Sequence, residues 1–175
     1  MGESIANGNG RFDALWWRQA VYQGKSQAMP GAVEFLNEVH KQGVEIFYVS
    51  NRYASANYDA TVQNFKGLGF SSVDKDHVIL FEKDSDKQPR FDAIAKKYYV
   101  VVYIEDNAGD FPIDTKGKTL AERNGIIDAH KEDFGTTFVV FPNPAYGSWV
   151  SALAKGYQNL SPEEQKQVNN QYLQQ

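Results

Sequence analysis

Residues 99–107 of this chain read Tyr99-Val100-Val101-Val102-Tyr103-Ile104-Glu105-Asp106-Asn107. The first six are aromatic or β-branched, which is typical of a strand buried on both faces of a sheet, and polar residues end the run abruptly. Residues 44–49, VEIFYV, have a similar character and are followed directly by Ser50-Asn51-Arg52. We therefore predict two buried strands, at 44–49 and 99–104, each with polar side chains at its carboxyl end.

Helical patterns alternate with these strands along the chain. Pro30 is expected to begin one helix and Gly43 to end it. Further helices are predicted at 12–23, 56–66, 90–97, 120–130 and 149–155, with a last one that opens at Ser161-Pro162, and further strands at 78–81 and 137–141. This alternation predicts an α/β fold, a doubly wound parallel sheet with helices on both faces.

The length of 175 residues predicts a single domain that can bury a sizeable core. Within it we expect residues 1–29 to form a cap-like N-terminal helical segment, residues 30–157 the core and residues 158–175 a C-terminal helix. The opening residues up to Gly10 are rich in Gly and Asn and are expected to form a loop.

The composition excludes several classes of function. Lys and Arg number 18 against 22 Asp and Glu, a net charge of −4 with no basic stripe, so binding to a nucleic acid polymer is not expected. The absence of cysteine excludes disulfides, thiolate chemistry and cysteine-ligated zinc. The longest apolar run, residues 98–104, has the length of a strand, so no membrane span is predicted, and no signal peptide is visible.

Three polar clusters follow predicted strands, and ligands of parallel α/β sheets bind outside the carboxyl ends of the strands. Ser50 and Asn51 offer a hydroxyl and an amide for a phosphoryl oxygen, and Lys87 offers a compact positive charge. Asp106 and Asp110 are hard oxygen ligands that suit Mg²⁺. Together these groups predict a phosphoryl-transfer site. Taken singly they have structural explanations: a turn cap, a surface lysine and an Asx-turn.

Five motifs follow one another along the chain: PGAVEF at 30–35, FYVSNR at 47–52, SDKQPR at 85–90, DNAGDF at 106–111 and PNPAYGSW at 142–149. Their order and local sequence resemble the class C acid phosphatases of the haloacid dehalogenase superfamily. The last three resemble the family's S-x-K-x-x-R, G-D-N-L-x-D-F and P-N-x-x-Y-G-x-W elements, and the resemblance runs from about residue 12 to residue 157.

The resemblance implies a Mg²⁺-dependent phosphomonoesterase that acts on nucleoside monophosphates and aryl phosphates at acidic pH. Ser50 and Asn51 would bind the transferring phosphoryl group, and Lys87 would neutralise its charge. Asp106 would bind Mg²⁺ with support from Asp110. The relatives are secreted or lipid-anchored, so an extracytoplasmic location is also implied.

Two aromatic positions match those that hold the leaving group in the relatives: Tyr146 and one of Trp16 or Trp17, with Trp17 the better fit by its distance from Pro30. Core packing is the alternative explanation for both. One departure from the family lies beside the metal position, where Glu105 replaces a glycine. This carboxylate is expected either to crowd the metal or to point away from it.

The family's nucleophile motif, an apolar strand ending in D-x-D-E-T, has no counterpart before the tryptophan-bearing helix. Its first Asp attacks phosphorus and its second acts as general acid and base. Asp84-Ser85-Asp86 overlaps the lysine element, and Asp74-Lys75-Asp76 precedes a strand, so neither fits. The central first strand is therefore expected to be missing or supplied otherwise, by a partner strand or a homodimer, and the chain alone to be inactive. A truncated enzyme, a split enzyme and a non-catalytic phosphate-binding or storage-type relative all stay open.

Overall fold

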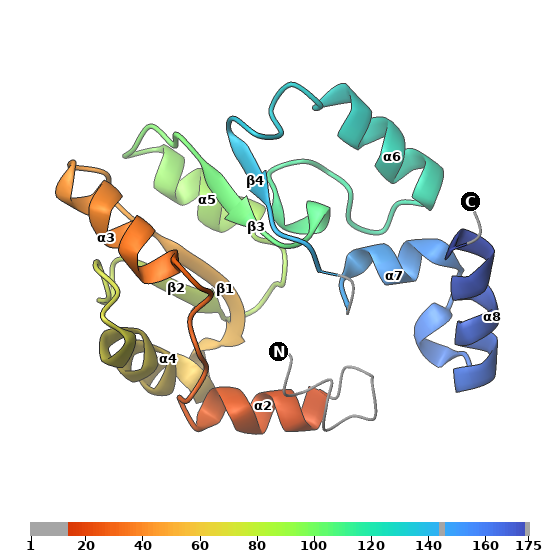
Figure 1. Ribbon diagram of the computed structural model, residues 1–175, viewed down its shortest axis with the longest axis horizontal. Coiled ribbons are helices and arrows are strands. Elements are labelled where there is room, and N and C mark those ends of the chain that lie inside the picture. The colour runs from red at the N-terminus through yellow and green to blue at the C-terminus, as the bar shows by residue number, and fades with distance from the viewer. Residues whose placement is uncertain (1–13, 144–145, 174–175) are drawn as a thin grey trace. The chain divides into compact units, whose positions relative to one another are not determined.

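The computed structural model describes residues 14–143 and 146–173 and divides into two compact units, Met1–Arg90 and Phe91–Gln175. Among the described residues, each unit contains one sheet of two parallel strands together with several helices (Figure 1). The predicted α/β class with parallel strands is thereby confirmed. The predicted loop up to Gly10 and the helix start at Phe12 lie outside the described residues, and the single-domain organisation stays a prediction.

Unit 1 follows the predicted alternation of helices and strands. Glycines end two of its helices: Gly43, with φ of 90°, follows α3, and the N–H of Gly69, with φ of 84°, donates to Lys66 O at 3.0 Å at the end of α4. Its elements are α2 (Ala14–Tyr22), α3 (Ala32–Lys41), β1 (Tyr48–Tyr53), α4 (Ala54–Leu68) and β2 (Val78–Phe81), and α5 (Gln88–Ala95) contains the boundary with unit 2.

The core of unit 1 lies where α4 packs on both strands of the β1–β2 sheet (Figure 1). Tyr48 pairs with Val78 in the ladder and packs its ring 5.0 Å from that of Phe65 on α4. The Tyr48 hydroxyl donates to Ser71 O at 2.7 Å, and burial raises the pKa of this phenol to about 12. Val73, Val78 and Leu80 complete the buried cluster.

Unit 2 is organised around aromatic packing on its own sheet. Tyr103 on β3 pairs with Phe138 on β4, and Phe111 packs its ring 5.0 Å from that of Phe138. Ile113 completes this buried cluster. The elements are β3 (Tyr103–Glu105), η1 (Ala108–Asp110), α6 (Leu120–Ala129), β4 (Phe138–Val140), α7 (Ser148–Leu153), η2 (Tyr157–Asn159) and α8 (Pro162–Leu173) (Figure 1).

Both strands that were expected to be the most apolar are displaced toward their carboxyl ends. The structure has β1 at Tyr48–Tyr53 instead of 44–49, and β3 at Tyr103–Glu105 instead of 99–104. Upstream of β3, Tyr99 is 91% exposed and Val101 is 53% exposed. A strand requires a hydrogen-bonding partner as well as an apolar composition, and among the described residues the ladders reach only the later part of each run.

Candidate functional site

The irregular part of β1 at Ser50 and Asn51 is fastened to the start of α5 by Arg90. The guanidinium donates from Nη1 to Ser50 O at 2.9 Å and from Nη2 to Asn51 Oδ1 at 2.6 Å. The Asn51 amide in turn donates to Ser85 O at 2.9 Å. The FYVSNR and SDKQPR motifs are therefore joined in space, because the planar fork of an arginine can serve two acceptors at once.

These contacts also explain why the β1–β2 ladder is irregular. The register passes from Val49↔Ile79 to Tyr53↔Phe81, so residues 50–52 are inserted into the strand instead of following it. Ser50 O accepts from a side chain, and Ser50 Oγ accepts from the main-chain N–H of Arg52 at 3.2 Å. The Ser50 hydroxyl thus accepts a local main-chain hydrogen bond within the irregular part of β1 that Arg90 fastens.

Lys87 lies in the turn that leads into α5 and is not a surface lysine, because only 9% of it is exposed. Its carbonyl oxygen accepts from Arg90 N at 3.0 Å. The carboxylates of Asp84 and Asp86 accept from main-chain N–H groups two residues further on, at 2.8 and 3.0 Å. The turn is therefore ordered on both sides of a lysine whose side chain is taken out of water, which is rare for this residue type.

In unit 2, an acidic cluster follows β3. Single carboxylate oxygens of Glu105, Asp106 and Asp110 all lie within 4.8 Å of one another, and all three residues are half-buried. Glu105 therefore lies beside the two predicted metal ligands and does not point away from them, while its effect on a bound metal stays a prediction. Three carboxylates at this spacing repel one another, and they form the all-oxygen donor set that Mg²⁺ prefers, so the residues present fit the ion.

The acidic cluster is connected to the turn that carries Tyr146. The Asn143 amide donates to Asp106 Oδ2 at 3.0 Å, and its Oδ1 accepts from Tyr146 N at 3.3 Å. The Trp149 indole donates to Tyr146 O at 3.2 Å. The position of Tyr146 is thus tied to that of a predicted metal ligand, whereas the intervening Pro144 and Ala145 lie outside the described residues.

Arg123 is a buried residue that bonds to the loop after the acidic cluster, and sequence reasoning missed it. It is 3% exposed, and its Nη1 donates to Thr115 O at 2.9 Å and to Ser148 Oγ at 3.1 Å, with Nη2 3.5 Å from Asn107 Oδ1. Burial lowers the pKa of this guanidinium. A Cβ at Gly109 would collide with Ser148 Oγ, so the loop also packs tightly. No local pattern marks an arginine in the middle of a helix as functional.

The predicted site residues are distributed over both units, and each group is described within its own unit. Unit 1 contains Ser50, Asn51 and Lys87, joined through Arg90, and also Trp17, which is half-buried on α2. Unit 2 contains Asp106, Asp110 and Tyr146. The two aspartates lie near each other and near Glu105, and Asn143 hydrogen-bonds to both Asp106 and Tyr146. The catalytic, phosphate-binding, substrate-binding and metal-binding roles of these residues stay predictions.

Parallel strands with Ser50 and Asn51 near the end of one and a carboxylate cluster after another are typical of α/β proteins that bind ligands at the carboxyl ends of their strands. The family model described as HAD superfamily, subfamily IIIB (acid phosphatase), matches residues 3–149. The chain belongs to this acid phosphatase family, which confirms the predicted family and makes it a member of a family of hydrolases.

Two solved structures are similar to this chain over nearly its whole length. They are the class C acid phosphatase from Bacillus anthracis and the same enzyme with tungstate bound. Each is 29% identical in sequence with a TM-score of 0.86, and the match covers 97% of this chain and 70% of the other. The predicted haloacid dehalogenase-like fold is confirmed by this similarity.

Two coarser predictions also hold. The family generally uses a divalent metal, and the chain contains an acidic cluster, formed by Glu105, Asp106 and Asp110, that could hold one. Across residues 14–143 and 146–173, no helix is both long enough and apolar enough to cross a bilayer.

Proposed function

We propose that this chain binds phosphomonoesters, nucleoside monophosphates and aryl phosphates among them, in a Mg²⁺-dependent phosphatase site of the family type. This proposal rests on the hydrogen bonds from Arg90 to Ser50 O and Asn51 Oδ1, here called the Arg90 clamp. Together with the bond from Asn51 to Ser85 O, the clamp joins Ser50 and Asn51 to the segment that contains Lys87. These are the residues to which the family resemblance assigns phosphate binding. Tungstate in the Bacillus anthracis enzyme supports the proposal, since tungstate is a tetrahedral oxyanion like phosphate.

In unit 1 the proposed roles follow from the chemistry of each group. Ser50 and Asn51 bind phosphoryl oxygens through their hydroxyl and amide donors, and Lys87 neutralises the negative charge of the ester. Burial of Lys87 favours this role, because a partly desolvated ammonium interacts more strongly with an anion than one in bulk water. Arg90 positions the first two residues and does not itself touch the substrate.

In unit 2 the proposed metal ligands are Asp106 and Asp110, with Glu105 as a third carboxylate. When bound, Mg²⁺ would neutralise charge on the phosphoryl oxygens. Asn143 would orient Asp106 through its 3.0 Å hydrogen bond to Oδ2. Trp17 and Tyr146 are the proposed contacts of the leaving group. An extracytoplasmic location and a partner strand or homodimer also belong to the proposal.

Binding is tested by calorimetric titration of the chain with tungstate and inorganic phosphate, with and without Mg²⁺. Lys87→Met should weaken oxyanion binding by about tenfold or more, as expected for the loss of a charge-assisted contact. Lys83→Met removes an exposed lysine from the same segment and should leave the affinity unchanged. Equal affinities for the two variants would overturn the role of Lys87.

Metal binding is tested in the same titration. Asp106→Asn should remove the Mg²⁺ dependence of oxyanion binding, whereas Asp114→Asn, a change to an exposed aspartate in the same unit, should keep it. The binding of phosphate and of Mg²⁺ is coupled if each ligand raises the affinity of the chain for the other, and thermodynamic linkage then makes the two factors equal. Independent binding of the two would contradict a single phosphatase site.

Turnover is tested separately, because no strand in this sequence ends in the family's D-x-D-E-T motif. Mg²⁺-dependent hydrolysis of an aryl phosphate is measured for the chain alone and in the presence of a peptide that carries such a strand. We expect no hydrolysis by the chain alone. Rescue by the peptide supports a split or truncated enzyme, and oxyanion binding without rescue supports the second candidate, a non-catalytic phosphate-binding or storage-type relative. Hydrolysis by the chain alone would contradict our expectation that the chain by itself lacks the nucleophile.

A further inference from the structure

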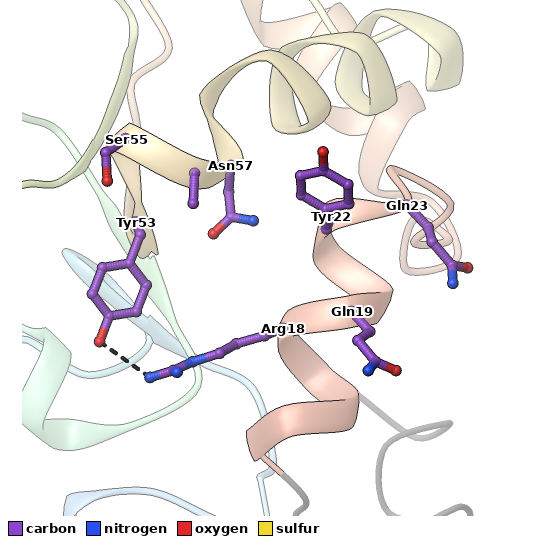
Figure 2. A pocket seen from close by; sticks show the side chains of 8 residues that line it. Arg18, Gln19, Tyr22, Gln23, Tyr53, Ser55 and Asn57 are labelled. Carbon is purple, nitrogen blue, oxygen red and sulfur yellow. Dashed lines mark hydrogen bonds between the residues drawn. The ribbon is translucent and has the colours of Figure 1, made fainter.

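A pocket of about 650 Å³ lies between α2 and the start of α4 in unit 1 (Figure 2). Arg18 and Tyr22 line it from α2, and Tyr53, Ser55 and Asn57 line it from the end of β1 and the first turn of α4. None of the residues that line it is a phosphate, leaving-group or metal residue of the proposed phosphatase site. The volume is in the range of small-molecule sites.

Asn57 is the lining residue that most needs a ligand. It is only 5% exposed, its side chain lies on the face of α4 that is turned toward α2, and among the described residues its carboxamide has no hydrogen-bond partner (Figure 2). Of the other buried polar residues of α4, Thr61 accepts from Arg52 at 3.3 Å, and Asn64 donates to Ser26 O at 3.0 Å while its Oδ1 has no partner within the described residues. A buried amide without a protein partner is normally satisfied by a ligand or by ordered water.

The electrostatics of the pocket favour an anion. Arg18 is the only charged side chain that lines it within the described part of the chain, and no carboxylate does. α4 is 15 residues long, and its N-cap residue, Tyr53, makes no side-chain capping bond. The main-chain N–H groups of its first turn, where Ser55 lies, therefore bring unsatisfied donors and the positive end of the helix dipole to the same pocket.

Two tyrosine rings give the pocket its apolar surface. The Tyr53 hydroxyl accepts from Arg18 Nη2 at 3.4 Å, and the Arg18 guanidinium carbon lies 5.3 Å from the centroid of the Tyr53 ring. The Tyr22 ring lies on the α2 side of the pocket and is largely exposed (Figure 2). Exposed aromatic faces on two sides favour a flat apolar group as the body of the ligand.

We propose that this pocket binds a small aromatic oxyanion. Arg18, the Asn57 amide and the free N–H groups of α4 bind its carboxylate or phosphate group, and the rings of Tyr22 and Tyr53 contact its ring. The site is additional to the proposed phosphatase site and does not depend on it.

The test titrates the full ¹⁵N-labelled chain with four probes and follows the side-chain amide signals of Asn57, which are identified by their loss in Asn57→Ala. The probes are phenylphosphonate, benzoate, inorganic phosphate and neutral benzamide. We expect the aromatic anions to shift these signals saturably, with inorganic phosphate weaker because it lacks a ring. The stronger of phenylphosphonate and benzoate identifies the natural head group as phosphate or carboxylate. No shift with any probe, or an equal shift with benzamide, would show a merely hydrated pocket and overturn the proposal.

Matched variants separate this pocket from other sites. Arg18→Gln should weaken binding of the aromatic anion by about tenfold, whereas Lys66→Gln, an equal charge change at the far end of α4, should leave it unchanged. Equal effects of the two variants contradict the proposal. Lys87→Met should not alter the shift at Asn57. If it abolishes the shift, the anion binds at the phosphatase site instead, which overturns this inference and leaves the proposed function intact.

Discussion

A single guanidinium, that of Arg90, has acceptors on three other residues: Ser50 O, Asn51 Oδ1 and, at 3.1 Å, Asp86 O. Arg90→Met removes all three hydrogen bonds at once and should lower the free energy of unfolding by about 3 kcal/mol. Arg90→Lys should recover only part of this loss, since a lysine cannot present a planar fork. Urea denaturation measures both variants against Lys83→Met, and a midpoint shared by all three would contradict the clamp.

Arg123 is the corresponding residue of unit 2: it is 3% exposed, and its side chain bonds to three other residues. Arg123→Met removes the donor of Ser148 Oγ and the shorter of the two hydrogen bonds to Thr115 O, and it should cost about 2–4 kcal/mol of stability. Because this residue also lies 3.5 Å from Asn107 Oδ1, beside the acidic cluster, Mg²⁺ affinity should fall as well. Lys131→Met, a change to an exposed residue just after α6, is the control for urea denaturation and Mg²⁺ titration. An unchanged Mg²⁺ affinity would limit Arg123 to a stabilising role.

At the scale of elements, the sequence predicted helices better than strands. Helix ends are encoded locally, as at Gly43 after α3 and at Ser161, where Glu164 N donates to Ser161 Oγ at 3.3 Å. Strand bounds depend on partners far away in the sequence, so β1 and β3 are displaced from the apolar runs that predicted them. The site residues could be proposed because their motifs are local in the sequence. The contacts of Arg90 and Arg123 join residues that are far apart in the sequence, so they could not be predicted.

The N-terminus of α6 is a testable example of local encoding. Thr119 Oγ1 accepts from Glu122 N at 3.3 Å, and the Glu122 carboxylate accepts from Thr119 N at 2.8 Å, which forms a capping box. Thr119→Ala should cost about 1 kcal/mol at neutral pH. The hydrogen bonds from Thr119 lower the pKa of Glu122 below its ordinary value of 4.5.

Because the pKa of Glu122 is lower in the folded state, its stabilising contribution is present in full above about pH 4.5 and is lost as the pH falls through the lower, folded value. The stability difference between the natural chain and Glu122→Gln should therefore be largest at neutral pH and shrink under acid conditions. Thermal unfolding of both proteins across this range measures the difference. A difference that is constant with pH would show that the carboxylate contributes no more than an amide does.

At the scale of the whole molecule, the division into two units and the predicted single domain lead to different expectations for the number of unfolding transitions. Each unit contains, within the described residues, a single pair of parallel strands. Parallel strands are normally buried in larger sheets, and a pair of strands alone is at best marginally stable in water. We therefore expect neither unit to remain folded when the other unfolds, so that the chain denatures in one transition.

The tryptophans allow each unit to be followed separately, because Trp16 and Trp17 lie in unit 1 and Trp149 lies in unit 2. Trp149→Phe leaves only reporters of unit 1, and the double change Trp16→Phe with Trp17→Phe leaves only the reporter of unit 2. Within each variant, the urea midpoint from tryptophan fluorescence should coincide with that from far-ultraviolet circular dichroism, since a cooperative domain loses all its structure together. Because both midpoints are measured on the same variant, any loss of stability caused by the substitution affects the two midpoints equally. A fluorescence transition that precedes the dichroism transition in either variant would show that its unit unfolds alone, and the chain would then consist of two domains.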